Sequence, residues 1–382
     1  MKKTRNSRIT RIKKKMCNSS IDIISHLPGN VLEKILMCLP IQDAVRTSIL
    51  SRKWRYVWVK LPQLVFDDLF YRHFHKTPHD KLLMIIYQVM LLHRGPIIKF
   101  ALCVSGLQSC SEIDNLILVV SNNDIQDFTI RIWKGEPYKL PSSLYTCSLL
   151  KHLNIRSCIL KPPPGFEGFN RLLSLYLYDV VIAEDVLSHL ISSCPLLEDL
   201  TLQSSTSLDS LEVVGPNLKS VCCEGHFRSI CFSNTSHLAN VSIYLQGSRN
   251  KLFLSEGEIS SSVVLLGSVP VIEFLELDFC IVKAFPGPTS AIRAVLDFSE
   301  VHGCSDVSLN QLRKVDMNNV SGTKPELEFI ELLLAKSPML EVMLIELNAQ
   351  NIADHLRIVK ELTGFRRASP QAEMKFVDQD ED

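Results

Sequence analysis

Three histidines close together in the chain have the residue type that metal binding would need. His73, His75 and His79 lie within seven residues, and imidazole nitrogens are common zinc ligands. No cysteine pair stands near them to complete a ligand set. We therefore interpret them as a solvated cluster, with a metal site as the alternative.

A second group could carry thiol chemistry. Cys222, Cys223 and His226 place thiols near an imidazole, the pairing that activates a cysteine nucleophile. Cys223, however, takes an apolar position in a repeat described below, which predicts a buried thiol. No G-x-S-x-G, G-x-G-x-x-G or G-x-x-x-x-G-K-[ST] motif occurs in the chain. We expect a protein that is not an enzyme and that uses no metal and no cofactor.

The composition narrows the class of protein further. Of 382 residues, 46% are hydrophobic and 21% are charged, which is typical of a globular chain with a sizeable core. No run of 18 apolar residues could span a bilayer, so we expect no membrane partner. The 12 cysteines are scattered and no secretory signal precedes them, so we expect reduced thiols inside the cell.

Charge is distributed unevenly. The totals are 41 basic and 41 acidic residues, but residues 1–16 hold eight basic and no acidic ones, so the rest is mildly acidic. A mildly acidic body argues against a nucleic-acid partner. The cluster Lys13-Lys14-Lys15 is of the type that directs nuclear import. A solvated tail is an equal alternative and an organelle transit peptide a minor one, and we expect a nuclear or cytoplasmic protein.

The remainder of the chain is repetitive. Leu150, Leu153, Ile155, Cys158 and Leu160 fit the template L-x-x-L-x-L-x-x-N/C-x-L of one leucine-rich repeat. Full or shorter matches begin at Ile97, Ile125, Leu150, Leu172, Leu197, Leu218, Leu238, Ile272, Leu312 and Leu340. Seven of the nine intervals lie within about 20–29 residues, the period of this class. The longer intervals of 34 and 40 residues and the poorly patterned segment 283–308 leave the repeat count open.

A recurring Pro-x-apolar-Glu element supports the repeat. It begins at Pro195, Pro270 and Pro338, each time after an apolar helical run, at 186–191, 259–266 and 327–334. Proline ends a helix, so the unit is a helix, a stop and a strand. Such units bury their apolar faces only by stacking, which predicts an α/β solenoid with strands on the concave wall.

A helical module precedes the repeats. Val31, Leu32, Ile35, Leu36 and Leu39 form an apolar helical stripe that ends at Pro40. We expect a second helix over 41–50 and a third beginning at Ser51, with Trp54 and Trp58 on one face. Three short helices enclose little core, so the module either seals the first repeat or binds a partner.

The residues of this module closely resemble an F-box. The matching positions are Leu27-Pro28, Val31-Leu32, Ile35-Leu36, Leu39-Pro40, Asp43, Arg46-Thr47-Ser48, Leu50-Ser51 and Trp54-Arg55-x-x-Trp58. Near the other end, further stretches look like an FBD domain: Leu312–Val320, Glu326–Ile330, Ser337-Pro338-x-Leu340-Glu341 and Arg366-Arg367-Ala368-Ser369-Pro370-x-Ala372. The chain thus resembles the plant F-box/FBD/leucine-rich-repeat proteins.

The resemblance implies a role without catalysis. Such proteins dock on a Skp-family adaptor, and through it on cullin and RING subunits, while the repeats hold a target protein for ubiquitination. The implied adaptor-binding or module-core positions are Leu27, Pro28, Val31, Ile35, Leu36, Leu39, Trp54 and Trp58. Concave strand positions that alternate with the leucines are the target-binding candidates: Asn154, Arg156, Tyr176, Tyr178, Thr201, Gln203, Ser242, Tyr244, Glu276 and Asp278.

The expected organisation is a short three-helix F-box, then an irregular leucine-rich-repeat array that ends in an FBD module. In residue numbers we expect a basic disordered tail (1–20), the F-box (21–61), a linker and connecting helix (62–96), the repeats (97–308), the FBD domain (309–377) and an acidic tail (378–382). The alternative function is a repeat scaffold that acts without the ubiquitin machinery.

Overall fold

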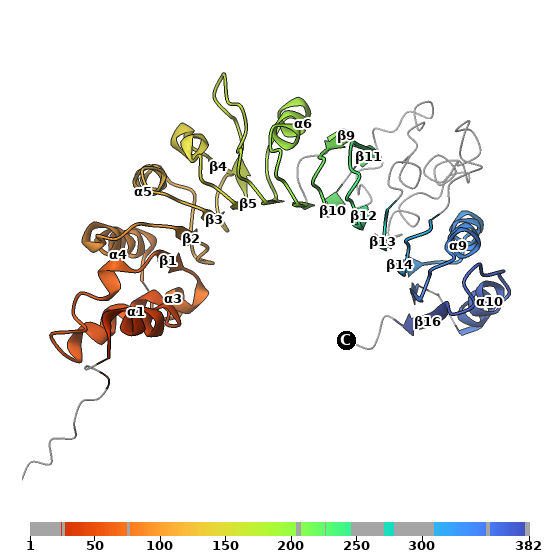
Figure 1. The fold of residues 1–382 in the computed structure, drawn as a ribbon, viewed down its shortest axis with the longest axis horizontal. Helices are drawn as coiled ribbons and strands as arrows, with labels where there is room; N and C mark the ends of the chain where they lie inside the picture. The colour runs from red at the N-terminus through yellow and green to blue at the C-terminus, as the bar shows by residue number, and fades with distance from the viewer. Residues whose placement is uncertain are drawn as a thin grey trace, which may run out of the picture.

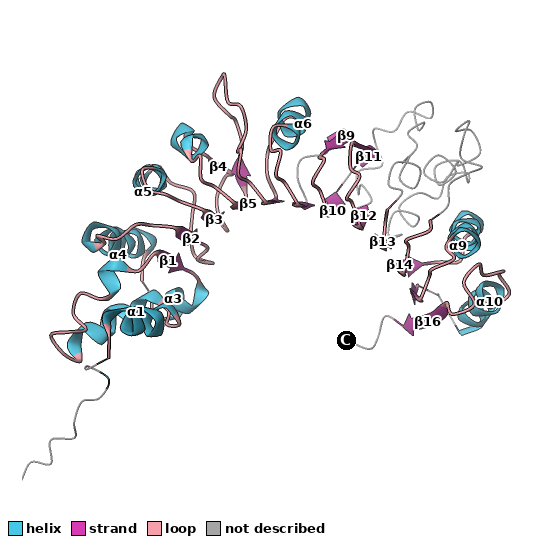
Figure 2. Cartoon of the chain, viewed as in Figure 1, coloured by secondary structure: helices cyan, strands magenta, loops and turns pink. Residues whose placement is uncertain are grey.

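One parallel sheet organises the whole described chain. The computed structural model describes residue 24 and residues 27–74, 77–203, 208–225, 227–245, 271–278, 309–348 and 352–378. These residues form an arc, with a twelve-stranded sheet along the inner side and helices, loops and short strands along the outer side (Figures 1 and 2). The stacked repeats thus give a solenoid-like arrangement, as the sequence predicts.

The strands follow the chain order and every neighbouring pair is parallel. In sheet order they are β1 (Gln63–Phe66), β2 (Lys99–Leu102), β3 (Asp127–Arg131), β5 (His152–Arg156), β7 (Ser174–Tyr178), β8 (Asp199–Gln203), β10 (Ser220–Gly225), β12 (Asn240–Leu245), β13 (Phe274–Asp278), β14 (Lys314–Val320), β15 (Val342–Leu347) and β16 (Glu373–Asp378). The ten repeat matches each give one of these strands, from β2 to β15.

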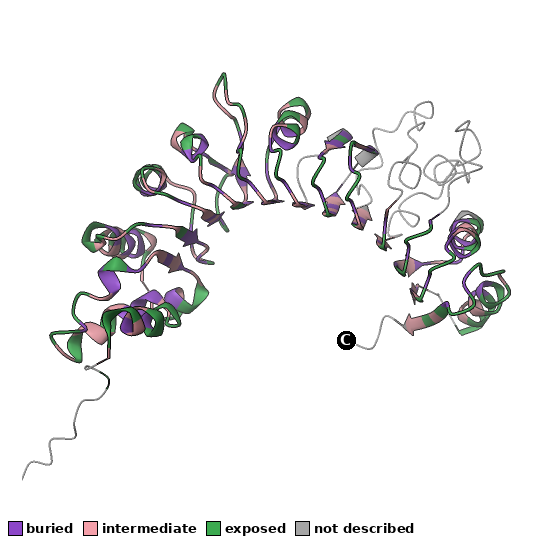
Figure 3. Ribbon diagram, in the orientation of Figure 1, coloured by how far each residue is buried: buried purple, intermediate pink, exposed green. Residues whose placement is uncertain are grey.

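Alternation along each strand builds the core. Successive side chains of a strand point to opposite faces, so every second residue faces the outer layer. Leu153 of β5 pairs with Leu175 of β7, which pairs with Leu200 of β8, and all three are buried. The same row continues to Phe100 near one end and Met343 near the other. Buried residues therefore run the length of the array (Figure 3).

Helices cover the outer side at both ends and near the middle (Figure 1). They are α4 (His79–Leu92), α5 (Glu112–Ser121), α6 (Glu184–Ser192), α9 (Lys324–Lys336) and α10 (Ile352–Thr363), with a 3₁₀ turn at Ser142–Thr146. The helices before Pro195 and Pro338 end where the prolines predict, and strands β8 and β15 follow. The run 259–266, expected as a third such helix, lies outside the described residues.

The unit of helix, stop and strand does not hold throughout. Between β8 and β10 the outer element is β9 (Leu208–Val214), and between β10 and β12 it is β11 (Phe227–Ser233). These two strands pair in parallel with each other, as do the short β4 (Tyr138–Lys139) and β6 (Cys158–Ile159). The repeats that begin at Leu197 and Leu218 are the shortest, at 21 and 20 residues, and an extended segment crosses the layer in fewer residues than a helix.

The predicted third helix of the N-terminal module is wrong. The module contains α1 (Gly29–Met37) and α2 (Ile41–Arg46), followed by 3₁₀ turns at Thr47–Ile49 and Trp58–Lys60. Residues 52–57 form turns. In them the amide of Trp54 donates to the carbonyl of Ser51, and the amide of Val57 donates to the carbonyl of Trp54. Both Trp54 and Trp58 are buried in the core shared with the sheet, so tertiary packing overrides the helical pattern.

The segment 62–96, expected as a linker and connecting helix, contains the helix, but its linker part is wrong. Residues 63–66 form β1, in which the buried Leu64 and Phe66 alternate with half-buried positions and pair with Phe100 and Leu102. Helix α3 (Asp68–Arg72) follows, and the connecting helix is α4. The segment is therefore the first unit of the array.

The C-terminal part continues the same sheet through β14, β15 and β16. The FBD boundaries at 309–377 remain a prediction. The basic tail (1–20), the segment 283–308 and residues 379–382 of the acidic tail lie outside the described residues. In the ranges that the structure covers, no helix is long and apolar enough to cross a membrane.

Candidate functional site

Burial divides the eight candidate adaptor-binding residues of the N-terminal module. Three are buried (Leu36, Trp54 and Trp58), two are half-buried (Leu27 and Val31) and three are exposed (Pro28, Ile35 and Leu39). The buried three belong to the core and act by holding the module together. The exposed three are available to a partner. Their roles in adaptor binding stay a prediction.

The module exposes more large apolar side chains than a small solvated unit needs. We call this set the module surface: Ile24, Ile35, Met37, Leu39, Ile49, Leu50 and Tyr56. Ile49 is 85% exposed and Leu50 is 65% exposed. Seven such groups on one short module make it a candidate interaction site. Our sequence reasoning did not place Ile24, Met37, Ile49, Leu50 and Tyr56 among the adaptor-binding candidates, because they fall outside the helical stripe that it followed.

The same module is rich in exposed positive charge. Its exposed basic residues are Lys34, Arg46, Arg52, Lys53, Arg55 and Lys60. The two acidic residues between 27 and 61, Glu33 and Asp43, are half-buried. The module therefore offers apolar anchors among cations, which suits a partner with apolar pockets and an acidic rim.

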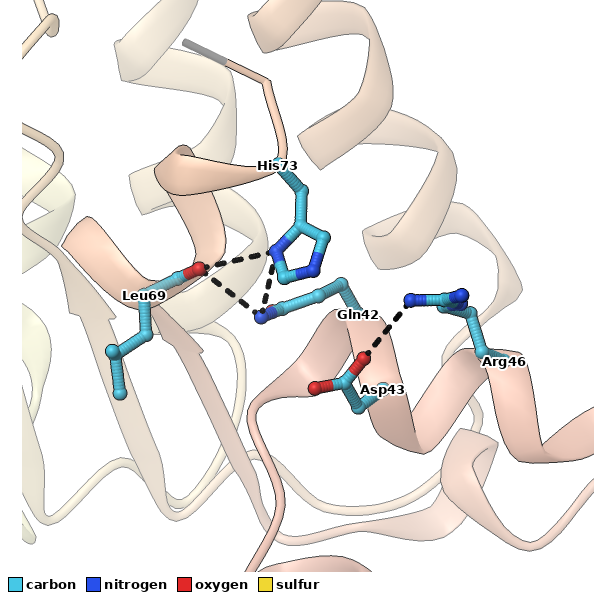
Figure 4. A network of polar contacts seen from close by, with 5 residues as sticks. All are labelled: Gln42, Asp43, Arg46, Leu69 and His73. Atoms are coloured by element: carbon cyan, nitrogen blue, oxygen red, sulfur yellow. Dashed lines mark hydrogen bonds and ion pairs between the residues drawn. The ribbon is translucent and has the colours of Figure 1, made fainter.

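A polar network joins the module to the first unit of the array (Figure 4). The side-chain amide of Gln42 in α2 donates to the carbonyl of Leu69 in α3 at 3.2 Å and lies 3.5 Å from Nδ1 of His73. On the exposed side of α2, Arg46 pairs with Asp43 at 3.4 Å. Gln42 is itself buried, so these contacts fix α2 against α3.

Backbone contacts strengthen the junction. The amides of Arg94 and Gly95 both donate to the carbonyl of Val59, at 2.8 and 3.1 Å. A Cβ on Gly95 would lie 2.7 Å from the carbonyl oxygen of Lys60, so only glycine permits this approach. Buried residues of the module and of the array belong to one core cluster. The module surface therefore has a fixed position relative to the sheet.

The structure places all ten candidate target-binding residues on the inner face of the sheet. Asn154, Tyr176, Thr201, Ser242 and Glu276 fall in one cross-strand row. Arg156, Tyr178, Gln203, Tyr244 and Asp278 fall in the neighbouring row. All ten are half-buried, as expected for side chains on a concave surface. Whether any of them touches a target stays a prediction.

Other residues of these rows were not among the candidates predicted from the sequence. Cys222 and Glu224 of β10 stand between the residues of β8 and β12, and Thr129 and Arg131 of β3 extend the rows toward the module. Asp316 and Asn318 of β14 extend them at the other end. The alternation after Leu218, Ile125 and Leu312 carried the signal, since it fixes which strand residues face inward.

The cysteines lack the character of a nucleophile. Cys223 is fully buried and burial raises the pKa of its thiol. Burial and the nearby Glu276 and Glu224 raise the pKa of Cys222 to about 11. A thiol nucleophile needs a depressed pKa, so neither group is activated. His226 lies outside the described residues.

The histidines of the cluster make separate local contacts. His79 accepts a hydrogen bond from the amide of Gln108 at 3.1 Å, whereas His73 joins the network with Gln42. His75 lies outside the described residues. In the described ranges no group of three or more His, Cys, Asp or Glu side chains could hold a metal ion.

Comparison with known proteins identifies the family of this chain. A family model for the F-box domain matches residues 24–65, and one for the LRR repeats of the FBD-associated F-box protein At5g56370 matches residues 113–277. The F-box/FBD/LRR-repeat protein At1g13570 of Arabidopsis thaliana is 32% identical over 94% of this chain and 99% of its own length. The putative F-box/FBD/LRR-repeat protein At4g00315 of the same plant is 31% identical over 56% of this chain and 52% of its own. The chain belongs to the F-box/FBD/LRR-repeat family.

Proposed function

We propose that this chain is the substrate-recognition subunit of an SCF-type (Skp-cullin-F-box) ubiquitin ligase. F-box proteins generally serve as the substrate receptors of such ligases. The observation that carries the proposal is the module surface, a set of apolar side chains exposed on a module otherwise locked into the array. A Skp-family adaptor would cover this surface, and through it the cullin and RING subunits would join.

The chain would contribute positioning rather than chemistry. The inner face of the sheet would hold a target protein while the adaptor tethers the conjugating machinery to the other end of the same body. Such tethering raises the effective concentration of the target's lysines at the enzyme that modifies them. A single core from the F-box to the array supports this role, because it fixes the relation between the two surfaces.

Copurification with a Skp-family adaptor tests the proposal. We expect the full chain to bind, and Ile49→Ser/Leu50→Ser to bind at least about tenfold more weakly, since exposed anchors carry most of an interface's energy. The matched control is Leu91→Ser/Leu92→Ser, which removes two equally exposed apolar residues at the end of α4. Absence of binding by folded wild type would sink the ligase proposal and leave the repeat scaffold.

Localisation is a separate proposal. The basic cluster within residues 1–16 supports a nuclear or cytoplasmic protein. A fluorescent fusion with and without residues 1–16 tests it. Nuclear signal that depends on this segment supports import, and signal confined to an organelle contradicts both placements.

A further inference from the structure

Two pairs of like charges stand directly opposite each other on the inner face of the sheet. Arg131 of β3 pairs in register with Arg156 of β5. Six and seven strands along the array from β3, Glu276 of β13 and Asp316 of β14 are opposite each other in the same way. Like charges at directly opposed positions destabilise a sheet. A face that keeps two such pairs, of opposite sign, departs from this rule, and natural proteins make such departures at functional sites.

The arginine pair is held in a geometry that leaves it ready for carboxylates. The guanidinium of Arg156 lies 4.5 Å from the ring centroid of Trp133, and that of Arg131 lies 5.6 Å from the ring centroid of Tyr178. Stacking occupies the faces of a guanidinium and leaves its N–H donors directed outward from the edge. Asp179 already contacts the edge of Arg156 at 3.2 Å, which shows that the edge accepts a carboxylate.

Both arginines are half-buried and so only partly accessible. The side chain of Arg156 is 35% exposed, and Trp133 is 41% exposed. Strands β2, β3, β5 and β7 carry Lys99, Arg131 and Arg156 at inward positions against two carboxylates, Asp127 and the Asp179 that contacts Arg156 directly after β7. This part of the inner face is therefore net positive.

The acidic pair has contacts of another kind. Glu276 accepts a hydrogen bond from the hydroxyl of Ser242 at 2.9 Å, a neutral donor. Asp316 receives Lys314 at 2.6 Å on Oδ2, while its buried Oδ1 accepts no hydrogen bond from the residues that the structure describes. Glu224 and Asp278 lie in the neighbouring row. With four carboxylates and one lysine at inward positions, the surface from β10 to β14 is net negative.

We propose that the inner face recognises an extended target segment of split charge, whose acidic end lies over Arg131 and Arg156 and whose basic end lies over Glu276 and Asp316. The inference rests on the proposed target-holding function and names the chemistry of the target. Six strand spacings separate the centres of the two pairs. At about 4.8 Å per spacing this is roughly 29 Å, the length of an extended segment of about nine residues.

Fluorescence anisotropy with the purified full chain tests the segment directly. The probe is a labelled nine-residue peptide with four glutamates, one alanine and four lysines in blocks. Its control has the same composition with the two charges alternating. We expect the block peptide to bind about tenfold more tightly, and more weakly as salt rises, because only the block matches both pairs. Equal affinity of the two peptides would overturn the proposal.

Matched variants of the chain locate the binding. Arg131→Glu/Arg156→Glu should lose about tenfold in affinity for the block peptide. Lys161→Glu/Arg171→Glu makes the same change of charge at exposed residues outside the strands and should bind as wild type does. A loss of equal size in both variants would show attraction by net charge alone and would overturn the assignment of the site.

Two further measurements distinguish a failure of this inference from a failure of the adaptor-binding proposal. Adaptor binding is measured on the same preparation, so a chain that binds the adaptor and ignores the block peptide refutes this inference without touching the docking proposal. The repulsion itself is tested without ligand by thermal unfolding of Arg131→Gln, Arg156→Gln and the double variant. We expect the double variant to lose more than the two single losses combined, because each single change already relieves a repulsion that the double change can relieve only once. A smaller loss would mean that the arginines support each other, which contradicts the argument.

Discussion

Ile35 and Leu36 are neighbours on α1, and alanine at each should have opposite consequences. Leu36 is fully buried, whereas Ile35 is 38% exposed and belongs to the module surface. Leu36→Ala would open a cavity in the core beside the sheet. We expect it to lower the free energy of unfolding by about 3 kcal/mol, within the usual range for buried leucine.

Ile35→Ala should cost far less. A fully buried isoleucine side chain contributes about 2 kcal/mol, and Ile35 is only partly covered. Alanine also favours a helix over the β-branched residue by a few tenths of a kcal/mol. The net loss should be about 1 kcal/mol. Adaptor binding, by contrast, should fall with Ile35→Ala, because the lost atoms are at the surface that the adaptor would cover.

Urea unfolding followed by tryptophan fluorescence measures the first effect, since Trp54 and Trp58 are two of the three tryptophans and both lie in the module. Titration with a Skp-family adaptor measures the second. An Ile35→Ala variant as unstable as Leu36→Ala would refute the burial argument. An Ile35→Ala variant that binds the adaptor as tightly as wild type would refute the assignment of α1 to the interface.

Three other changes test the junction and the C-terminal part. Gly95→Ala should lower stability by about 1–3 kcal/mol in urea unfolding, because its Cβ would overlap the backbone of Lys60. The control Gly29→Ala should cost nothing, because no atom lies within 4 Å of the added Cβ. Equal losses in the two variants would contradict the close approach at Gly95. Gln42→Ala should cost about 1–2 kcal/mol, since it removes the donor to Leu69, and unchanged stability would show that the network is not structural. Burial raises the pKa of Glu326, so its pKa in the folded state lies above the unfolded value of about 4.3. The contribution of Glu326 to the free energy of unfolding is therefore complete below about pH 4.3 and is lost as the pH rises through the folded pKa. Wild type should therefore lose stability relative to Glu326→Gln as pH rises from about 4 toward neutral, and parallel pH profiles in urea unfolding would refute this.

The sheet could be predicted from the sequence because each inner strand has two apolar residues in a fixed register. The two end strands of the sheet, β1 and β16, were harder to predict. Leu61, Leu64 and Phe66 fit the short template, but Pro78 and the histidines on either side of it suggested a linker. For β16 the signal is weak, since Gln371 stands where the other repeats have leucine or isoleucine. End repeats lack a neighbour on one side, so their sequences are freer to depart from the pattern.

The surface of the module could not be predicted from periodicity. Ile35 and Leu36 are adjacent, and adjacent residues on a helix point about 100° apart. An apolar stripe that includes both members of such pairs is too wide to be buried by one neighbour. Which member faces the core depends on where β1 and α3 lie, and this is set by residues far from the helix. The separation of core from interface therefore required coordinates.

The junction between the module and the array explains why a small helical unit can expose so many apolar groups and still hold its shape. A unit of two short helices and two 3₁₀ turns has too little interior to fold alone, so side chains such as Trp58 must pack into a core elsewhere. The first unit of the array supplies that core, and Gln42 and Gly95 fix the contact. The apolar residues not used by the core are then free for an adaptor. Under the proposed function, the same contact holds a bound target at a fixed distance from the ligase, so a loosened junction should reduce ubiquitin transfer before it reduces the binding of either partner.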